Sequence, residues 1–578
     1  MMRLVDSSLA PSRSDALKRS FRSRPFWFPL GLALALVVAD GRGGQSVAAE
    51  DPPTTPANDL PDELFVNPIA EGADPWVVRD EANDRYLWCF SDANRGIAIA
   101  EGSLTRIGRR HVVWRAPKSG PYSKEVWAPE LHRLDDRWYV YFAASDGDNA
   151  NHRAYVLQSE TADPLGAYRM HGPLRTGDGP DRDMPNIWAI DMTVLRHRGH
   201  RYAVWSGWDA PGTDRQFLYI ARMKSPTELT GPRVRLTDND TYLWERIEPN
   251  ENARGLHEGP QVFDAGGRIH LIYSCGASWL PTYKLGRLTL TGDDPLDPSA
   301  WTQTSEPVFQ STEQTYGVGH SCFVKSPDGS QWWHVFHAKR DREPGWRRAI
   351  HGQPMSVDEN GTPKFGKPLA AGQPLARPSG EVPRASSIER RGDSNDSGDS
   401  GDFSYYGHQD FFRVEHDSIQ LGVEKTLVVN PYRSGEKILW QHPVVSDVDA
   451  TVTIDFSGRR DSRDAGLLFR CTGAAVGYDA QRGYFAGLIP RTNLIIAGKT
   501  DGRVWNELGR ASTSIDVDRP QRLHVRMTDN RMTIRHVGGG TLEVTDDTYR
   551  RGRIGFRVVD TAATFTDWRL RSQPPPDR

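Results

Sequence analysis

The stretch "VWAPELHRLDDRWYVYFAASDG", residues 126–147, contains the unit from which the fold of this chain can be predicted. A short motif opens it, an alternating apolar and polar run follows, and the turn "LDDRW" leads into a second run rich in Tyr, Val and Phe. Aspartates between two such runs are typical of a tight hairpin turn, and aromatic and β-branched residues favour strands over helices. The stretch therefore predicts two paired antiparallel strands.

Four other segments repeat this pattern. They are "GADPWVVRDEANDRYLWCFSD" (72–92), "IWAIDMTVLRHRGHRYAVWSGW" (187–208), "LHEGPQVFDAGGRIHLIYSCG" (256–276) and "GVGHSCFVKSPDGSQWWHVFHAK" (317–339). Aligned on their openings, the five segments place a polar residue at one corresponding position, at intervals of 56 to 67 residues: Asp74, Glu130, Asp191, Glu258 and His320. Repetition of a whole multi-stranded unit predicts an all-β fold, a five-bladed β-propeller over residues 60–375.

A propeller would bring these five positions together, because the start of each innermost strand faces the central axis. Carboxylates held that close cannot all ionise at their usual pKa values, and at least one should stay protonated near neutral pH. A carboxyl pair with separated pKa values is what hydrolysis of a glycosidic bond requires. Any single Asp or Glu could instead be a turn or cap residue, but five equivalent polar positions favour a functional cluster.

Three tryptophans accompany the first three carboxylates. Trp76, Trp127 and Trp188 each lie within three residues of one of them. Sugar rings present apolar C–H faces that pack on indoles, although core packing explains any one of these tryptophans equally well. Together with the carboxylates, they favour a carbohydrate pocket.

On these residues the chain resembles glycoside hydrolase family 43, a family of five-bladed propeller enzymes. The motifs "DPWVV", "WAPEL", "IDMTV", "HEGP" and "GHSCFVKSPDG" occur in the family's order. The resemblance implies that Asp74 is the general base, Glu258 the general acid, and Asp191 the carboxylate that tunes and orients the acid. It also implies inversion of configuration, for which the base and the acid should lie about 6.5–9.5 Å apart with water between them.

The resemblance extends to three further positions. His320 matches a histidine near the axis that contacts a bound metal ion, commonly calcium, or its water shell; a structural core histidine is the alternative. Arg348 resembles an arginine of the last blade that reaches the sugar, although neighbouring Arg347 leaves the register open. Glu130 belongs to the substrate site, where support of the catalytic groups is the expected role. The chemistry itself needs no cofactor, and a calcium ion at the axis would be structural.

The run "SCGASWLPTYKLGRLTLTGDDPLDPSAW" looks most like the exo-acting α-L-arabinofuranosidases of that family. We therefore expect release of terminal α-L-arabinofuranosyl groups from arabinan, arabinoxylan or a related glycan. A β-xylosidase is the close alternative, because the two pentoses present similar hydroxyl patterns. A propeller that binds glycans without cutting them is the alternative from a different class, although all three expected carboxylates are present.

The composition changes after the propeller. Residues 376–402 include a Ser-, Asp- and Gly-rich run, which predicts a flexible linker more strongly than a calcium-binding repeat. Residues 403–572 contain alternating segments such as "DATVTIDF" and "QRLHVRMTDNRMTIRHV", which predict an antiparallel β-sandwich of jelly-roll type. It resembles concanavalin-like and laminin-G-like domains, and it could be a passive cap or a glycan-binding module. Tyr478, Tyr484 and Trp505 are the candidate residues for sugar stacking.

The first 49 residues resemble an export signal. A basic stretch that contains Arg13, Lys18, Arg19, Arg22 and Arg24 precedes the apolar run "PLGLALALVVA", and "SVAAE" offers a cleavage site after small residues. The prediction is a signal peptide over residues 1–49 of Sec or twin-arginine type, and a periplasmic or extracellular protein with no transmembrane segment once processed; an uncleaved membrane anchor is the alternative. Without these residues the formal charge of −3 becomes about −7, which argues against nucleic acid as a partner.

Four cysteines, at 89, 275, 322 and 471, are too few for a disulfide scaffold. A bridge between Cys275 and Cys322 and buried free thiols are both compatible with the sequence.

Overall fold

The computed structural model describes residues 60–177, 186–248, 253–381, 403–415, 418–422, 435–441 and 444–573. In these residues the only helical elements are short 3₁₀ turns, and the strands form the sheets of a five-bladed propeller and of a C-terminal sandwich. The all-β prediction is confirmed. The predicted signal peptide and residues 382–402 of the predicted linker lie outside the described residues.

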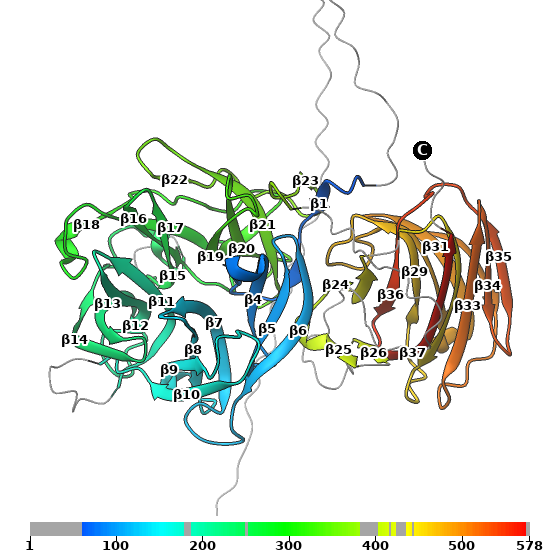
Figure 1. Cartoon of the computed structure of the whole chain (residues 1–578), viewed down its shortest axis with the longest axis horizontal. Helices are drawn as coiled ribbons and strands as arrows, with labels where there is room; N and C mark the ends of the chain where they lie inside the picture. The colour runs from blue at the N-terminus through cyan, green and yellow to red at the C-terminus, as the bar shows by residue number, and fades with distance from the viewer. Residues whose placement is uncertain are drawn as a thin grey trace, which may run out of the picture. The chain divides into compact units, whose positions relative to one another are not determined.

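Blades 1 to 4 of the propeller are sheets with four strands in meander order, and Figure 1 shows the blades arranged around one axis. Blades 1 and 2 consist of β3 (Trp76–Asp80), β4 (Arg85–Ser91), β5 (Gly96–Ser103) and β6 (Arg106–Arg115), and of β7 (Lys124–Leu134), β8 (Arg137–Ser145), β9 (Arg153–Ser159) and β10 (Tyr168–Pro173). Blades 3 and 4 consist of β11 (Ala189–His197), β12 (His200–Trp208), β13 (Gln216–Ser225) and β14 (Glu228–Arg235), and of β15 (His257–Ala265), β16 (Arg268–Cys275), β17 (Lys284–Leu290) and β18 (Trp301–Gln303).

Blade 5 closes the ring with strands from both ends of the propeller sequence. It consists of β19 (Tyr316–Lys325), β20 (Trp332–Lys339), β21 (Arg348–Val357) and, outermost, β2 (Ala70–Glu71), with β22 (Pro363–Lys364) also paired to β21. A second contact between the ends pairs β1 (Leu64–Val66) with β23 (Pro374–Ala376). The innermost strands β3, β7, β11, β15 and β19 contact one another in turn, and β19 contacts β3. The five-bladed propeller is confirmed.

The innermost strands share one backbone feature at the axis. Each carries, just before the strand or within it, a residue with φ between 41° and 56°: Asp74, Ala128, Asp191, Gly259 and His320. In blades 2 to 5 the strand register shifts at this residue, as expected of a β-bulge. The alignment from the sequence is therefore wrong at two positions, since Glu130 lies two residues after the bulge residue of its blade and Glu258 lies one residue before. An alignment on Pro75, Pro129 and Pro260, which directly follow three of these residues, would have given the correct register.

The C-terminal region consists of two seven-stranded antiparallel sheets. The first has the order β24 (Phe403–Tyr406), β27 (Lys437–Trp440), β36 (Arg553–Val559), β29 (Asp464–Thr472), β30 (Arg482–Ile489), β31 (Leu494–Asp501) and β32 (Trp505–Ser512). The second has the order β25 (Phe412–Glu415), β26 (Ser418–Leu421), β37 (Ala563–Gln573), β28 (Asp447–Asp455), β33 (Gln521–Thr528), β34 (Arg531–His536) and β35 (Thr541–Thr545). Buried apolar residues of both sheets pack into one core, which confirms an antiparallel sandwich. The boundaries 60–375 and 403–572 remain proposed.

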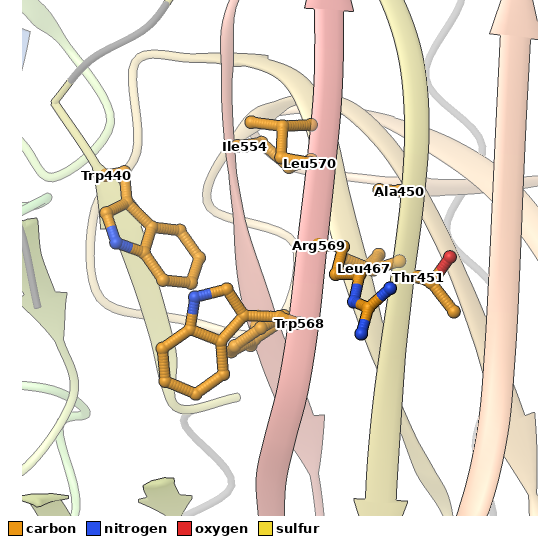
Figure 2. A pocket seen from close by; sticks show the side chains of 9 residues that line it. Trp440, Ala450, Thr451, Leu467, Ile554, Trp568, Arg569 and Leu570 are labelled. Carbon is orange, nitrogen blue, oxygen red and sulfur yellow. The ribbon is translucent and has the colours of Figure 1, made fainter. Parts of the chain in front are cut away.

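An apolar cavity of about 140 Å³ lies between the two sheets. Figure 2 shows the indoles of Trp440 and Trp568 beside it, and their ring centroids lie 6.0 Å apart. Leu467, Ile554 and Leu570 are among its other lining residues. Ala450, Leu467 and Ile554, which line the cavity, also belong to the apolar core of the sandwich.

One sequence-based expectation for the C-terminal region needs correction. Tyr484 is fully buried, and its hydroxyl donates to Asp546, so it is a core residue that no sugar can reach. The ring of Trp505 packs against Phe485, 6.2 Å between centroids, and Tyr478 donates its hydroxyl to Asp560. Both side chains are part-exposed, and their role in sugar stacking stays a prediction.

All four cysteines are buried free thiols, which resolves the alternative between a Cys275–Cys322 bridge and thiols in favour of thiols. No helix in the described part of the chain is long and apolar enough to cross a bilayer.

Candidate active site

Asp74, between β2 and β3, is surrounded by three side chains of blade 5. Its Oδ1 lies 3.3 Å from Nδ1 of His320, 3.3 Å from Nδ1 of His337 and 3.5 Å from Nη1 of Arg348. The backbone N–H of Asp74 also donates to Nδ1 of His337, at 3.2 Å. The carboxylate remains about a quarter exposed, so a small molecule can still reach it.

These neighbours keep Asp74 ionised. Burial by itself raises the pKa of a carboxyl group, but the charges of His320 and Arg348, together with the adjacent imidazole of His337, lower the pKa of Asp74 well below its usual range. Burial opposes the charged form of His320, yet Asp74, Asp191 and the other axial carboxylates raise its pKa. Burial lowers the pKa of His337 to about 4, so this imidazole is neutral at pH 7. Asp74 is therefore a carboxylate able to accept a proton.

Glu258, at the start of β15, receives two hydrogen bonds. The hydroxyl of Tyr283 donates to Oε1 at 2.8 Å, and Nε2 of Gln216 donates to Oε2 at 3.0 Å. Burial raises the pKa of Glu258, and the negative charge of Asp74 adds to the rise, against the opposing hydrogen bonds. A carboxyl group in this position holds its proton to higher pH than an exposed glutamate and can donate it.

Asp191 connects the bulge of blade 3 to the strand that carries Glu258. It is 4% exposed, and its Oδ2 accepts a 2.9 Å hydrogen bond from the backbone N–H of Gly259. Burial, followed by the charges of Glu258 and Asp74, raises the pKa of Asp191 to about 7. Asp191 therefore fixes the backbone next to Glu258, and the two carboxylates repel each other when both are ionised. The pKa values of Asp191 and Glu258 are raised, whereas the pKa of Asp74 is lowered.

Gly259 is required where these groups meet. Its φ is +56°, and a Cβ atom there would lie 3.0 Å from Nδ1 of His320. Only glycine combines this backbone conformation with the close approach of the imidazole.

Glu130 is buried, and both of its oxygens bind other side chains. Nε2 of Gln261 donates to Oε1, and Oε2 lies 2.8 Å from Nε2 of His132. Glu130 is only 2% exposed, which argues against direct contact with a sugar, and its supporting role at the axis stays a prediction.

The three predicted tryptophans differ in their surroundings. Trp188 is 4% exposed and stacks on Trp208 at 5.0 Å, so we assign it to packing. Trp76 donates its indole N–H to the carbonyl of Leu131 at 2.8 Å and is half-buried. Trp127 stacks on His152 at 3.8 Å and is also half-buried.

A pair of tryptophans that the sequence analysis missed lies next to the site. Trp346, in the loop between β20 and β21, is 58% exposed, and its ring lies 5.4 Å from that of Trp279 in the loop between β16 and β17. The guanidinium of Arg348 lies 5.3 Å from the centroid of Trp346. Arg347 instead pairs with Asp341 at 2.9 Å, so of the two arginines it is Arg348 that lies beside Asp74.

His337, Tyr283 and Gln216 were also missed. His337 lies in a quoted repeat, but only the pairing of Gly319 with His337 shows that its side chain meets Asp74. Tyr283 and Gln216 begin or precede outer strands, where the sequence shows no periodic signal that they reach the axis. Five repeats aligned strand by strand would have been needed to find them.

In the described parts of the chain no group of three or more His, Cys, Asp or Glu side chains is arranged to hold a metal ion. His320 uses Nδ1 on Asp74, and contact of this histidine with a calcium ion or its water shell stays a prediction.

Comparisons with known proteins concern the propeller. The family model "Glycosyl hydrolases family 43" matches residues 65–363. An extracellular exo-α-(1→5)-L-arabinofuranosidase of Streptomyces chartreusis is 33% identical over 290 residues, 48% of this chain and 84% of that protein. The enzyme of the same name from Streptomyces avermitilis is 31% identical over 336 residues, 55% of this chain and 66% of its own length. A crystal structure of an α-L-arabinofuranosidase from Lactobacillus brevis is 30% identical, with a TM-score of 0.48, over 53% of this chain and 98% of that one.

Proposed function

Since this chain belongs to glycosyl hydrolase family 43, we propose that it is an exo-acting α-L-arabinofuranosidase that releases terminal arabinofuranosyl groups from arabinose-bearing glycans. The observation that carries the proposal is the meeting of Asp74 and Glu258 at the axis with pKa values moved in opposite directions. The relatives from both Streptomyces species bear this activity in their names.

The proposed reaction is a single displacement with inversion. Asp74 accepts a proton from a water molecule as the water oxygen attacks the anomeric carbon, and Glu258 donates its proton to the glycosidic oxygen as that bond breaks. One proton is taken up and one is given, so the site is ready again once Asp74 releases a proton to solvent and Glu258 regains one. His320 and Arg348 hold Asp74 in the ionised form that the first transfer needs.

Asp191 is proposed as a positioning residue. It accepts a hydrogen bond from the N–H of Gly259, which fixes the peptide next to Glu258, and the two carboxyl groups repel each other when both are ionised. The first effect places the acid, and the second favours a state in which one of the two groups holds a proton before the bond breaks.

Trp279 and Trp346 are proposed to contact the sugar on the leaving-group side. An exo-acting enzyme buries one terminal sugar and leaves the rest of the chain at the mouth of its pocket. Trp346 is 58% exposed and lies against Arg348, which is 3.5 Å from Asp74, so it occupies such a mouth position. Its indole offers an apolar face to a sugar ring.

The decisive experiment compares wild type with Glu258→Gln and Asp74→Asn on an aryl α-L-arabinofuranoside, an aryl β-D-xyloside and linear arabinan. Wild type should prefer the arabinofuranoside, and NMR should show the inverted anomer first. A preference for the xyloside would favour the β-xylosidase alternative, and retention would exclude the water mechanism. Absence of turnover on every glycoside would favour a glycan-binding propeller.

We also propose that the protein is exported. The predicted signal peptide, residues 1–49, and the word extracellular in the names of both Streptomyces relatives support this. Detection of mature protein outside the cytoplasm, with an N-terminus near residue 49 or 50, would test it.

A further inference from the structure

One sheet of the sandwich has an outward face rich in arginine. In β28 and β33, and in residues 531–535 of β34, buried core residues alternate with residues that point outward. The six arginines of this face are Arg522, Arg526, Arg531, Arg535, Arg569 and Arg571, and all are exposed. We call these six residues and the outward residues between them the arginine face.

Strand register places these arginines in rows across the sheet. Arg569 pairs with Thr451, Thr451 with His524, and His524 with Arg535. In the next row Arg571 pairs with Asp449, and Asp449 with Arg526. Neighbouring strands lie about 4.8 Å apart, so the first row extends across roughly 14 Å. The face is therefore a two-dimensional array of cations, with a threonine hydroxyl and His524 between them in the first row and the carboxylate of Asp449 between them in the second.

Most of these cations are not neutralised within the protein. Arg531 pairs with Glu543 at 3.1 Å, while the other five arginines have no side-chain hydrogen bond or ion pair with any residue that the structure describes. The carboxylates of the face are already engaged: Asp449 by His524, Asp447 by Arg470, and Asp455 by the backbone N–H of Ser457. Six arginines against the carboxylates of Asp447, Asp449, Asp455 and Glu543 leave a positive surplus on this face, in a chain whose formal charge is −3.

The chemistry of the face indicates its ligand. Guanidinium groups bind carboxylate and sulfate oxygens through two parallel N–H donors, and threonine hydroxyls suit sugar hydroxyls. In β28, β33 and β34 no outward residue is Trp, Tyr, Phe or aliphatic. A stable protein interface needs an apolar, aromatic core, and single-stranded nucleic acid needs stacking platforms.

We propose that the arginine face binds an anionic polysaccharide, one that carries carboxylate or sulfate groups along its chain. The choice of a glycan over other polyanions rests on the proposed function of the propeller. The sandwich would hold the enzyme on a charged polysaccharide while the propeller removes neutral pentose branches. Recognition by charge also differs from the aromatic stacking predicted from Tyr484, which is buried.

The test uses the full chain in native gels that contain polygalacturonate, dextran sulfate or neutral linear arabinan. Wild type should be retarded by one or both anionic polymers, and this retardation should fall as salt rises. Any retardation by arabinan should not depend on the arginines of this face. The triple variant Arg526→Gln/Arg535→Gln/Arg569→Gln should bind about tenfold more weakly, because three exposed charge contacts are lost. Polygalacturonate and dextran sulfate separate carboxylate from sulfate recognition.

The matched control removes the same charge elsewhere in the sandwich, through Arg460→Gln/Arg503→Gln/Arg519→Gln in exposed loops. It should bind like wild type, and both triple variants should keep wild-type turnover of the aryl arabinofuranoside. Equal loss in the two variants, no retardation of wild type, or equal retention by duplex DNA would overturn the proposal. Because binding is measured without turnover, a failure here is distinct from failure of the proposed activity.

Discussion

The propeller axis and the interior of the sandwich are built from the same kind of element and have opposite chemistry. At the axis, five innermost strands bring together Asp74, Asp191, Glu258 and His320, and the pKa of each is displaced from its usual value. The core cluster of the sandwich is apolar and lies beside a cavity of about 140 Å³, while its buried charged groups, such as Lys437 and Arg470, lie outside that cluster.

Both regions contain bulges, and the side chains placed there differ. In the sandwich, β28 and β33 alternate regularly, whereas β29 has a bulge at Arg470, whose guanidinium donates to backbone carbonyl groups. The innermost strands of the propeller carry residues with positive φ at the axis, and a bulge there turns a polar side chain toward the centre at the cost of regular pairing.

The largest expected effect is at the axis. Asp74→Asn and Glu258→Gln should each lower kcat by about 10²–10⁴-fold on substrates with poor leaving groups, because each removes a proton-transfer group. Steady-state kinetics on arabino-oligosaccharides measures this. Glu543→Gln, which changes an exposed carboxylate of the sandwich, is the matched control and should retain wild-type kcat. Full activity of Glu258→Gln on such a substrate would contradict the acid assignment.

A smaller effect is expected from Asp191→Asn, which should shift the pH profile as well as lower kcat. The negative charge of Asp191 and that of Glu258 repel each other, so each raises the pKa of the other. Without that charge Glu258 loses its proton at lower pH, and the alkaline limb of kcat/KM should move toward acid. An unchanged alkaline limb would show that Asp191 acts only through the hydrogen bond to Gly259.

Trp346→Ala tests the rim of the propeller. Loss of one exposed stacking face should raise KM for arabino-oligosaccharides by about 2- to 10-fold, since such contacts contribute about 0.5–1.5 kcal/mol. The KM for an aryl arabinofuranoside with a small leaving group should change less. Leu243→Ala, at another exposed apolar residue of the propeller, should leave both values unchanged. Equal changes for both substrates would place Trp346 on the terminal sugar instead.

The smallest effect is expected in the sandwich. Ala450→Val adds two methyl groups beside the cavity, which should stabilise the sandwich by about 0.5–1 kcal/mol without altering turnover. Thermal unfolding followed by calorimetry would report the change. A lower transition temperature would mean that the added methyl groups clash with neighbouring core residues and do not enter the cavity.

Sequence reasoning predicted the strands, the five repeats and the convergence of the axial residues, because hairpin turns and aromatic periodicity are local signals. It misjudged the equivalence of Glu130 and Glu258, because a bulge changes register without changing composition. His337, Tyr283 and Trp346 were missed because their roles depend on which strands and loops meet across blades. Tyr484 was misassigned because an alternating strand pattern does not show which of its two faces is buried.

Closure of the ring by β2 has a consequence for biosynthesis. Asp74 follows β2 by three residues, whereas His320, His337 and Arg348, which keep it ionised, all belong to the last blade made. A nascent or truncated chain can contain Asp74, Asp191 and Glu258 and still lack the groups that make Asp74 a base. We therefore expect hydrolytic activity only after the first and last parts of the propeller have joined, so turnover can serve as an assay for closure of the ring.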